Sequence, residues 1–151
     1  MVNRFAQFTG AISAIYRDIQ KIERDEMEKY GLKGAFAQYL LAMDRHPDGI
    51  TAAALCEECD KDKAAVSRIL NEMETKGLVS RHPGDTPYRA RLFLTESGRT
   101  ATGYVCQKAV AAVERAGEGL TDEDRKAFYS ALGLIAGNLQ AICREGIPDQ
   151  L

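Results

Sequence analysis

Residues 62–98 read "DKAAVSRILNEMETKGLVSRHPGDTPYRARLFLTESG", and this stretch decides the fold class of the chain. Its first part has apolar residues three and four apart, which predicts an amphipathic helix from Lys63 to Lys76 with Asp62 as its N-cap. Gly77 then stands where a helix end favours a left-handed residue. Two strand-like runs follow, "LVSR" and "ARLFLT", separated by a loop that holds proline and glycine. The stretch therefore predicts a helix followed by a β-hairpin.

The segments just before this stretch supply the first half of a helix-turn-helix. Residues 33–46 predict a helix that ends before Pro47. Its apolar face consists of Phe36, Tyr39, Leu40 and Met43. The turn "PDGIT" leads to a short helix, "AAALCEEC", with Thr51 at the N-cap position. A short helix, a tight break and a longer helix before a hairpin are typical of a winged helix-turn-helix.

The longer helix divides into two faces, as a helix that reads DNA must. One stripe can be buried, and it consists of Val66, Ile69, Leu70 and Met73. The residues on the opposite side are mostly small or basic. Together with Thr51, the N-cap of the preceding short helix, they make up the candidate DNA-contact set: Thr51, Lys63, Ala64, Ser67, Arg68 and Asn71. Arg68 can reach a guanine edge or a phosphate. The acidic side chains of Glu57, Glu72 and Glu74 would have to point away from the duplex.

The predicted hairpin adds two arginines to the DNA-contact set. Arg89 and Arg91 are two residues apart, so we expect them to share one face of a strand, with Leu92 and Leu94 on the face toward the protein. A wing of this kind can place an arginine in or beside the minor groove. The alternative is that both arginines are solvated hairpin charges.

The distribution of charge agrees with a DNA-binding middle segment. The net charge of the 151 residues is −2, but residues 61–95 carry 7 basic and 4 acidic side chains, a balance of +3. Residues 1–60 carry 7 basic and 10 acidic side chains (−3), and residues 96–151 carry 6 and 8 (−2). The longest apolar runs, "LLAM" and "AAALC", are too short to cross a bilayer, and no signal-peptide pattern is present. We therefore expect a cytoplasmic protein without a membrane partner.

Amphipathic helices flank the predicted winged region on both sides. The first carries an apolar stripe of Phe5, Phe8, Ile12, Ile15, Tyr16, Ile19 and Ile22 and ends near Gly31. Thr95 caps a helix over residues 97–116, and Thr121 caps a last helix with the stripe Phe128, Leu132, Ile135, Leu139 and Ile142. Such stripes need a partner surface, which predicts a homodimer; the alternative is a compact monomer.

The chain resembles the MarR family of bacterial transcriptional regulators over nearly its whole length. The matching pieces are "ITAAALCEEC", "KAAVSRILNEMETKGLVSR" and "YRARLFLTESGR". The resemblance implies one MarR-like chain over residues 1–151, mainly α with a small β-hairpin wing. Residues 32–96 would form the winged helix-turn-helix, and residues 1–30 and 97–147 the dimerisation helices. It also implies a homodimeric repressor or activator whose DNA binding is often tuned by small ligands or oxidants.

Two further expectations follow from this resemblance. Many members carry an acid just before the wing arginine, whereas here the tip reads "GDTPYRAR", so Arg89 matches that arginine and Asp85 stands four residues before it. The family also implies a ligand pocket between the winged region and the long helices. Tyr16, Tyr39 and Tyr104 are candidates to line it, although aromatic residues on apolar stripes more often belong to the core.

The cysteines raise an alternative function. Cys56 and Cys59 form a Cys-x-x-Cys pair, which is found in redox enzymes and in metal sites. No second pair and no preceding βαβ pattern accompany it, so we expect core thiols here rather than a thiol switch or a metal site. Cys106 and Cys143 are expected to pack as well. We expect His46 at a helix end and His82 in an exposed loop.

The sequence thus predicts a sequence-specific DNA-binding transcriptional regulator that acts as a homodimer and responds to a small ligand, less readily to thiol oxidation. Its partners would be double-stranded DNA, a second copy and a small effector, with no cofactor and no metal. No catalytic motif is present, so an enzyme is not expected. The alternatives are a thiol oxidoreductase that uses Cys56 and Cys59 and a winged-helix protein adaptor that does not bind DNA.

Overall fold

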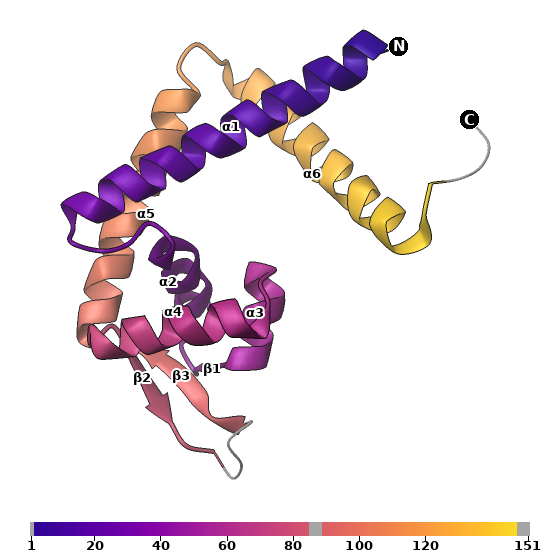
Figure 1. Ribbon diagram of the computed structural model, residues 1–151. Coiled ribbons are helices and arrows are strands. Elements are labelled where there is room, and N and C mark those ends of the chain that lie inside the picture. Colours follow the sequence, from indigo (N-terminus) through magenta and orange to yellow (C-terminus); the bar gives the residue numbers. More distant parts are fainter. Residues whose placement is uncertain (1, 85–88, 148–151) are drawn as a thin grey trace. The chain divides into compact units, whose positions relative to one another are not determined.

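The computed structural model describes residues 2–84 and 89–147 (Figure 1). In chain order its elements are α1 (Val2–Lys29), α2 (Phe36–Asp44), β1 (Ile50–Thr51), α3 (Ala52–Cys59), α4 (Lys63–Thr75), β2 (Val79–His82), β3 (Arg91–Leu94), α5 (Glu96–Ala116) and α6 (Asp122–Glu145). The fold is mainly helical with a small antiparallel sheet, as the sequence predicts. The chain forms two compact units, Met1–Ala109 and Val110–Leu151. The first unit contains the whole predicted winged helix-turn-helix.

Local capping chemistry explains where the helices begin. The Thr51 hydroxyl oxygen accepts a hydrogen bond from the Ala54 amide at 3.2 Å, and the Asp62 carboxylate accepts one from Ala65 at 2.8 Å. Thr121 and Asp124 form a reciprocal capping box at the start of α6. After α4, Gly77 has a φ of +71°, a left-handed conformation that glycine adopts without steric cost. These predicted helix boundaries are confirmed.

The sheet differs from the sequence prediction in three respects. It has three strands in the order β1-β3-β2, because Ile50 and Thr51 pair with Leu92 and Arg91. A strand of two residues is too short to show an alternating pattern, so the sequence gives no sign of it. His82 lies in β2 rather than in a loop. Arg89 lies outside β3, which begins at Arg91, so the two arginines do not share a strand face as expected.

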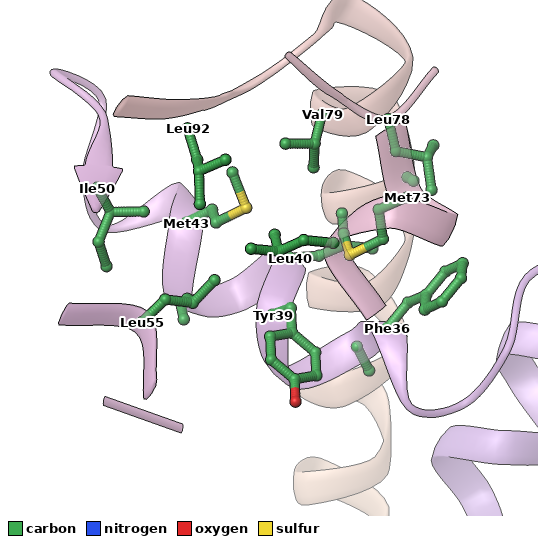
Figure 2. Packing of buried hydrophobic residues seen from close by; sticks show 14 of the residues in the cluster. Phe36, Tyr39, Leu40, Met43, Ile50, Leu55, Met73, Leu78, Val79 and Leu92 are labelled. Atoms are coloured by element: carbon green, nitrogen blue, oxygen red, sulfur yellow. The ribbon is translucent and has the colours of Figure 1, made fainter. Parts of the chain in front are cut away.

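The core of the first unit forms where α2, α3 and α4 meet the sheet (Figure 2). All four apolar residues predicted for the second helix are buried. Val66, Leu70 and Met73 of α4 are also buried, and Ile69 packs against the same cluster while partly exposed. Leu92 closes the cluster from β3. Burying a large aliphatic side chain stabilises a fold by about 1.5–3 kcal/mol, so this cluster holds α4 in one rotational setting.

The long terminal helices leave their apolar stripes exposed. On α1, Ile12, Ile15 and Ile19 are 43%, 52% and 47% exposed. α6 is described over its whole length and buries none of its residues. Cys143 is exposed on α6, so the expectation that it packs is wrong: the helix on which it lies has no buried residue. Among the described residues, no helix is long and apolar enough to pass through a membrane.

The corner between β2, β3 and α5 depends on one glycine. Gly98 is buried in the first turn of α5, where its amide donates to the hydroxyl oxygen of Thr95 at 3.0 Å. A Cβ atom on Gly98 would lie 2.0 Å from the carbonyl oxygen of Leu78. No side chain fits there unless the backbone moves.

We predict that Gly98→Ala lowers the free energy of unfolding by about 1–3 kcal/mol, because the added methyl group overpacks a backbone contact. Gly103→Ala is the matched control on the same helix, since a Cβ at Gly103 meets no atom within 4 Å. It should leave stability unchanged or raise it by about 0.5–1 kcal/mol. Urea unfolding at one protein concentration measures both; equal effects at the two glycines would contradict the packing argument.

Candidate nucleic-acid interface

The solvent-facing side of α4 carries the residues predicted to contact DNA. Lys63, Ala64, Ser67, Arg68 and Asn71 are all exposed, and we call this set the α4 ridge. On the opposite side of the helix, Val66, Leu70 and Met73 are at most 1% exposed. The ridge therefore projects from a helix that the core holds in place, which is the arrangement that a major-groove reader requires.

The acidic residues of α4 are neutralised by side chains from other elements. Lys33 Nζ lies 2.5 Å from the Glu72 carboxylate. Arg81 of β2 donates to both carboxylate oxygens of Glu74, at 3.2 and 3.0 Å. Glu74 raises the pKa of Arg81, which is thereby committed to this pair. The prediction that Glu72 and Glu74 turn away from a duplex agrees with these pairings, whereas Glu57 is exposed on α3.

At the wing, the structure places Arg89 and Arg91 beside one hollow of about 600 Å³. Thr51, His82, Pro83, Gly84 and Phe93 also line it. Arg89 is exposed. Arg91 Nη1 donates to the backbone carbonyl of Asp48 at 2.9 Å and approaches that of Gly49 at 3.4 Å. Asp85, which stands four residues before Arg89 in the sequence, lies outside the described residues.

A larger cavity of about 700 Å³ lies between α1, α2 and α4. Tyr16 and Tyr39 line it, but Tyr104 does not. Tyr104 instead stacks on Tyr30 with ring centroids 4.6 Å apart, and its hydroxyl lies 3.4 Å from the Glu26 carbonyl oxygen. Only two of the three tyrosines predicted for a ligand pocket therefore share a cavity.

The walls of this cavity carry charges of both signs, and Arg24 of α1 and Glu72 of α4 are among the lining residues. Glu23 contributes a half-buried carboxyl group from α1, and burial raises the pKa of Glu23. Lys61 and Arg68 contribute cationic side chains from the other side. Arg68 thus lines the cavity and belongs to the α4 ridge at the same time. The cavity can hold a small molecule that offers both polar and apolar groups.

The cysteine pair packs against the core of the first unit. Cys56 and Cys59 are half-buried against the core, as predicted. Burial raises the pKa of the Cys59 thiol, which lowers the fraction of reactive thiolate. Within residues 2–84 and 89–147, no group of His, Cys, Asp or Glu side chains is arranged to hold a metal ion. Cys106 is half-buried on α5.

Comparison with known proteins places this interface in a family. The model of the MarR family matches residues 30–89. A MarR transcriptional regulator of Methanosarcina mazei Go1 is 26% identical, with a TM-score of 0.80 over 90% of this chain and 99% of that one. Residues 30–89 belong to the MarR family.

Two more similar proteins bear on the MarR assignment. The HTH-type transcriptional regulator Rv1719 of Mycobacterium tuberculosis is 34% identical over 64 residues, which are 42% of this chain and 25% of the relative. The match thus spans about a quarter of that protein's length. MepR of S. aureus, solved as a complex with DNA, shares the fold at 17% identity with a TM-score of 0.77 over 87% of this chain and 96% of that one. Rv1719 and the Methanosarcina mazei protein are both regulators of transcription.

Several residues that shape the interface are not apparent from the sequence. Lys33 and Glu72 are 39 positions apart, so no helical spacing connects them. Glu58 of α3 pairs with Arg45 at 2.5 Å and with His46 Nε2 at 2.7 Å, which ties α3 to the end of α2. His46 follows α2, in agreement with its predicted place at a helix end. These cross-element pairs carry no local sequence signal.

We predict that Glu23→Gln raises the thermal unfolding midpoint at neutral pH. Burial raises the folded-state pKa, so the ionised carboxylate destabilises the fold at pH values above that pKa. The advantage of the variant should shrink as the pH falls toward the ordinary carboxyl pKa, where the side chain is protonated in both states. Glu28→Gln, at an exposed position of α1, is the control. A pH-independent gain would contradict this account.

Proposed function

We propose that this MarR-family chain is a sequence-specific regulator of transcription that binds double-stranded DNA as a homodimer and is tuned by a small ligand. One observation carries the proposal: the α4 ridge is exposed and cationic, while the acids of the same helix are paired by Lys33 and Arg81. The helix therefore offers a duplex no unpaired carboxylate from Glu72 or Glu74. The DNA complex of MepR, which has the same fold, supports this reading.

The proposed contacts divide by the kind of information they provide. Ser67, Arg68 and Asn71 would face base edges in the major groove, where arginine recognises guanine through two hydrogen bonds. Lys63 and the hydroxyl of Thr51 suit phosphates, which position the protein without reading sequence. Ala64 permits close approach of the helix because its side chain is small. The wing, with Arg91 at its root and Arg89 beyond it, completes the surface next to the minor groove.

A second copy is the proposed cover for the exposed stripes of α1 and α6. Phe128, Leu132 and Leu139 are 48%, 37% and 48% exposed in the single chain. Contiguous apolar surface of this extent on a water-soluble helix marks an interaction site. A two-fold dimer would set two α4 ridges roughly 34 Å apart, one turn of B-DNA, so that both enter the major groove on one side of the duplex.

The proposed effector site is the cavity between α1, α2 and α4. Its lining joins a helix of the proposed dimer surface, α1, to the helix that would read DNA, α4. A ligand changes the affinity for DNA if it binds more tightly to one of two arrangements of α1 and α4, one that can bind DNA and one that cannot. By linkage, DNA then changes the affinity for the ligand by the same factor. Tyr16, Tyr39 and Glu23 would contact the ligand. Thiol oxidation at Cys56 or Cys59 is not favoured, because both thiols are half-buried.

We predict that the purified protein selects a pseudo-palindromic duplex from a random pool and that its affinity falls steeply with salt. Arg68→Ala should weaken binding by about 1–3 kcal/mol. If Arg68 reads a base, preference should relax at one position; if it contacts a phosphate, the loss should be uniform and the salt slope should decrease by about 1. Arg17→Ala, which removes an exposed arginine from α1, is the matched control. If the wild type selects no duplex at low salt, DNA binding is refuted and the alternative of a winged-helix protein adaptor is favoured.

We further predict that Leu132→Glu converts the dimer to a monomer in sedimentation velocity, because it places a charge in the apolar stripe of α6. Gln140→Glu adds the same charge to the same helix away from that stripe, and it should leave the dimer intact. Far-ultraviolet circular dichroism checks that both variants keep their helices. A wild-type protein that sediments as a monomer at micromolar concentration would refute the dimer.

A further inference from the structure

We infer that Arg91 serves DNA binding as a positioning residue that anchors the root of the wing, while Arg89 makes the contact with the duplex. This inference rests on the proposed function. Both arginines line the same hollow, and sequence spacing assigns them the same role. Their surroundings in the structure are different, and that difference separates the two roles.

Arg91 occupies the point at which the hairpin leaves the sheet. It is the first residue of β3, and it stands opposite Thr51 of β1 on one side and His82 of β2 on the other. The described wing residues 83–84 and 89–90 lie directly beyond this row. The orientation of the wing relative to α4 is therefore set by how firmly this row of the sheet is held.

The Arg91 side chain attaches this row to a distant turn. Its Nη1 donates to the carbonyl oxygens of Asp48 and Gly49, at 2.9 and 3.4 Å, in the turn between α2 and β1. β1 contributes only two residue pairs to the sheet, so the guanidinium adds a substantial attachment of its own. Because a guanidinium stays protonated in proteins, this link persists at every physiological pH.

Phe93 supports the same attachment. It is two residues after Arg91, on the same face of β3, and a Cβ on Gly49 would lie 2.6 Å from its ring. The ring therefore rests directly on the Gly49 backbone, whose φ is +86°. The His82 ring lies against the Phe93 ring, with the ring centroids 4.7 Å apart and the planes tilted by 38°. Arg91 and Phe93 together clamp the 48–49 turn to the outer face of the sheet.

Within the described part of the chain, Arg89 has no attachment comparable to that of Arg91. It is exposed and lies outside β3. Among the residues that the structure describes, its guanidinium takes part in no hydrogen bond or ion pair. A Cβ on Gly84 would lie 2.4 Å from the Arg89 carbonyl oxygen, so the two arms of the wing approach closely at this point. Arg89 is thus exposed, and its guanidinium is not paired with any other described residue.

A double-mutant cycle tests this division of roles. The dissociation constant for the duplex selected by the wild type is measured over a range of salt for Arg89→Gln, Arg91→Gln and the double variant. We expect each single change to weaken binding about tenfold, and the double variant to bind within about twofold of Arg89→Gln, since Arg91 acts through Arg89. The salt slope should fall by about 0.9 for Arg89→Gln and no further for the double variant.

A direct contact between Arg91 and DNA would give a different result. If Arg91 contacts a phosphate directly, the two effects multiply to about a hundredfold and the double variant loses a further slope of about 0.9. Arg99→Gln is the matched control, because Arg99 Nη1 also donates to a backbone carbonyl, that of Leu94, at the far end of β3. That variant should bind DNA like the wild type.

Amide hydrogen exchange of the free protein supplies a readout that needs no DNA. Arg91→Gln should accelerate exchange of residues 49–51 and 91–92, whereas Arg89→Gln should leave these amides unchanged. Unchanged exchange in Arg91→Gln would overturn the inference even if DNA affinity falls. Should the wild type bind no duplex at all, the proposed function fails, and the exchange measurement still decides whether Arg91 anchors the wing root.

Discussion

The burial of one side of α4 is the constraint on which the rest of the structure depends. Val66, Leu70 and Met73 are inserted into the core made by α2, α3 and the sheet, so the helix cannot rotate about its axis without exposing them. The same burial turns Ser67 and Arg68 outward. A surface able to read DNA is therefore a consequence of how the core packs.

The cationic residues of the middle segment are divided between structure and surface. Arg81 is engaged with Glu74, and Arg91 is engaged with two backbone carbonyls. Arg68 and Arg89 keep exposed side chains. The local excess of +3 over residues 61–95 therefore overstates the number of cations available to a duplex. The net charge of −2 is compatible with DNA binding. The two acidic residues of α4, Glu72 and Glu74, are paired with cationic side chains, and the other acidic residues of the chain lie outside α4.

Local signals account for the part of the fold that the sequence predicts well. The caps at Thr51, Asp62 and Thr121 and the glycine stop at Gly77 act within three or four residues, so their patterns are visible in the chain. The alternation of buried and exposed positions on α4 is equally local. These features were sufficient to place the α4 ridge and the hairpin.

Features that depend on distant residues were beyond the reach of the sequence. Strand β1 exists only because β3 pairs with it, and the Lys33–Glu72 and Arg81–Glu74 pairs join different elements. Spacing gave Arg89 and Arg91 one role, since it does not reveal that Arg91 points at a turn more than forty residues away. The expectation that Cys143 packs is wrong for the same reason: periodicity indicates a face of a helix but not what lies against it.

The central claim is that the α4 ridge contacts the duplex, whereas Arg81, which is paired with Glu74, does not. The most direct measurement is the NMR spectrum of arginine Nε groups as the selected duplex is added. The account predicts that the Arg68 Nε signal shifts and exchanges more slowly with water, while that of Arg81, already bound to Glu74, stays in place. An Arg68 signal that does not respond, or an Arg81 signal that moves as far, would contradict it.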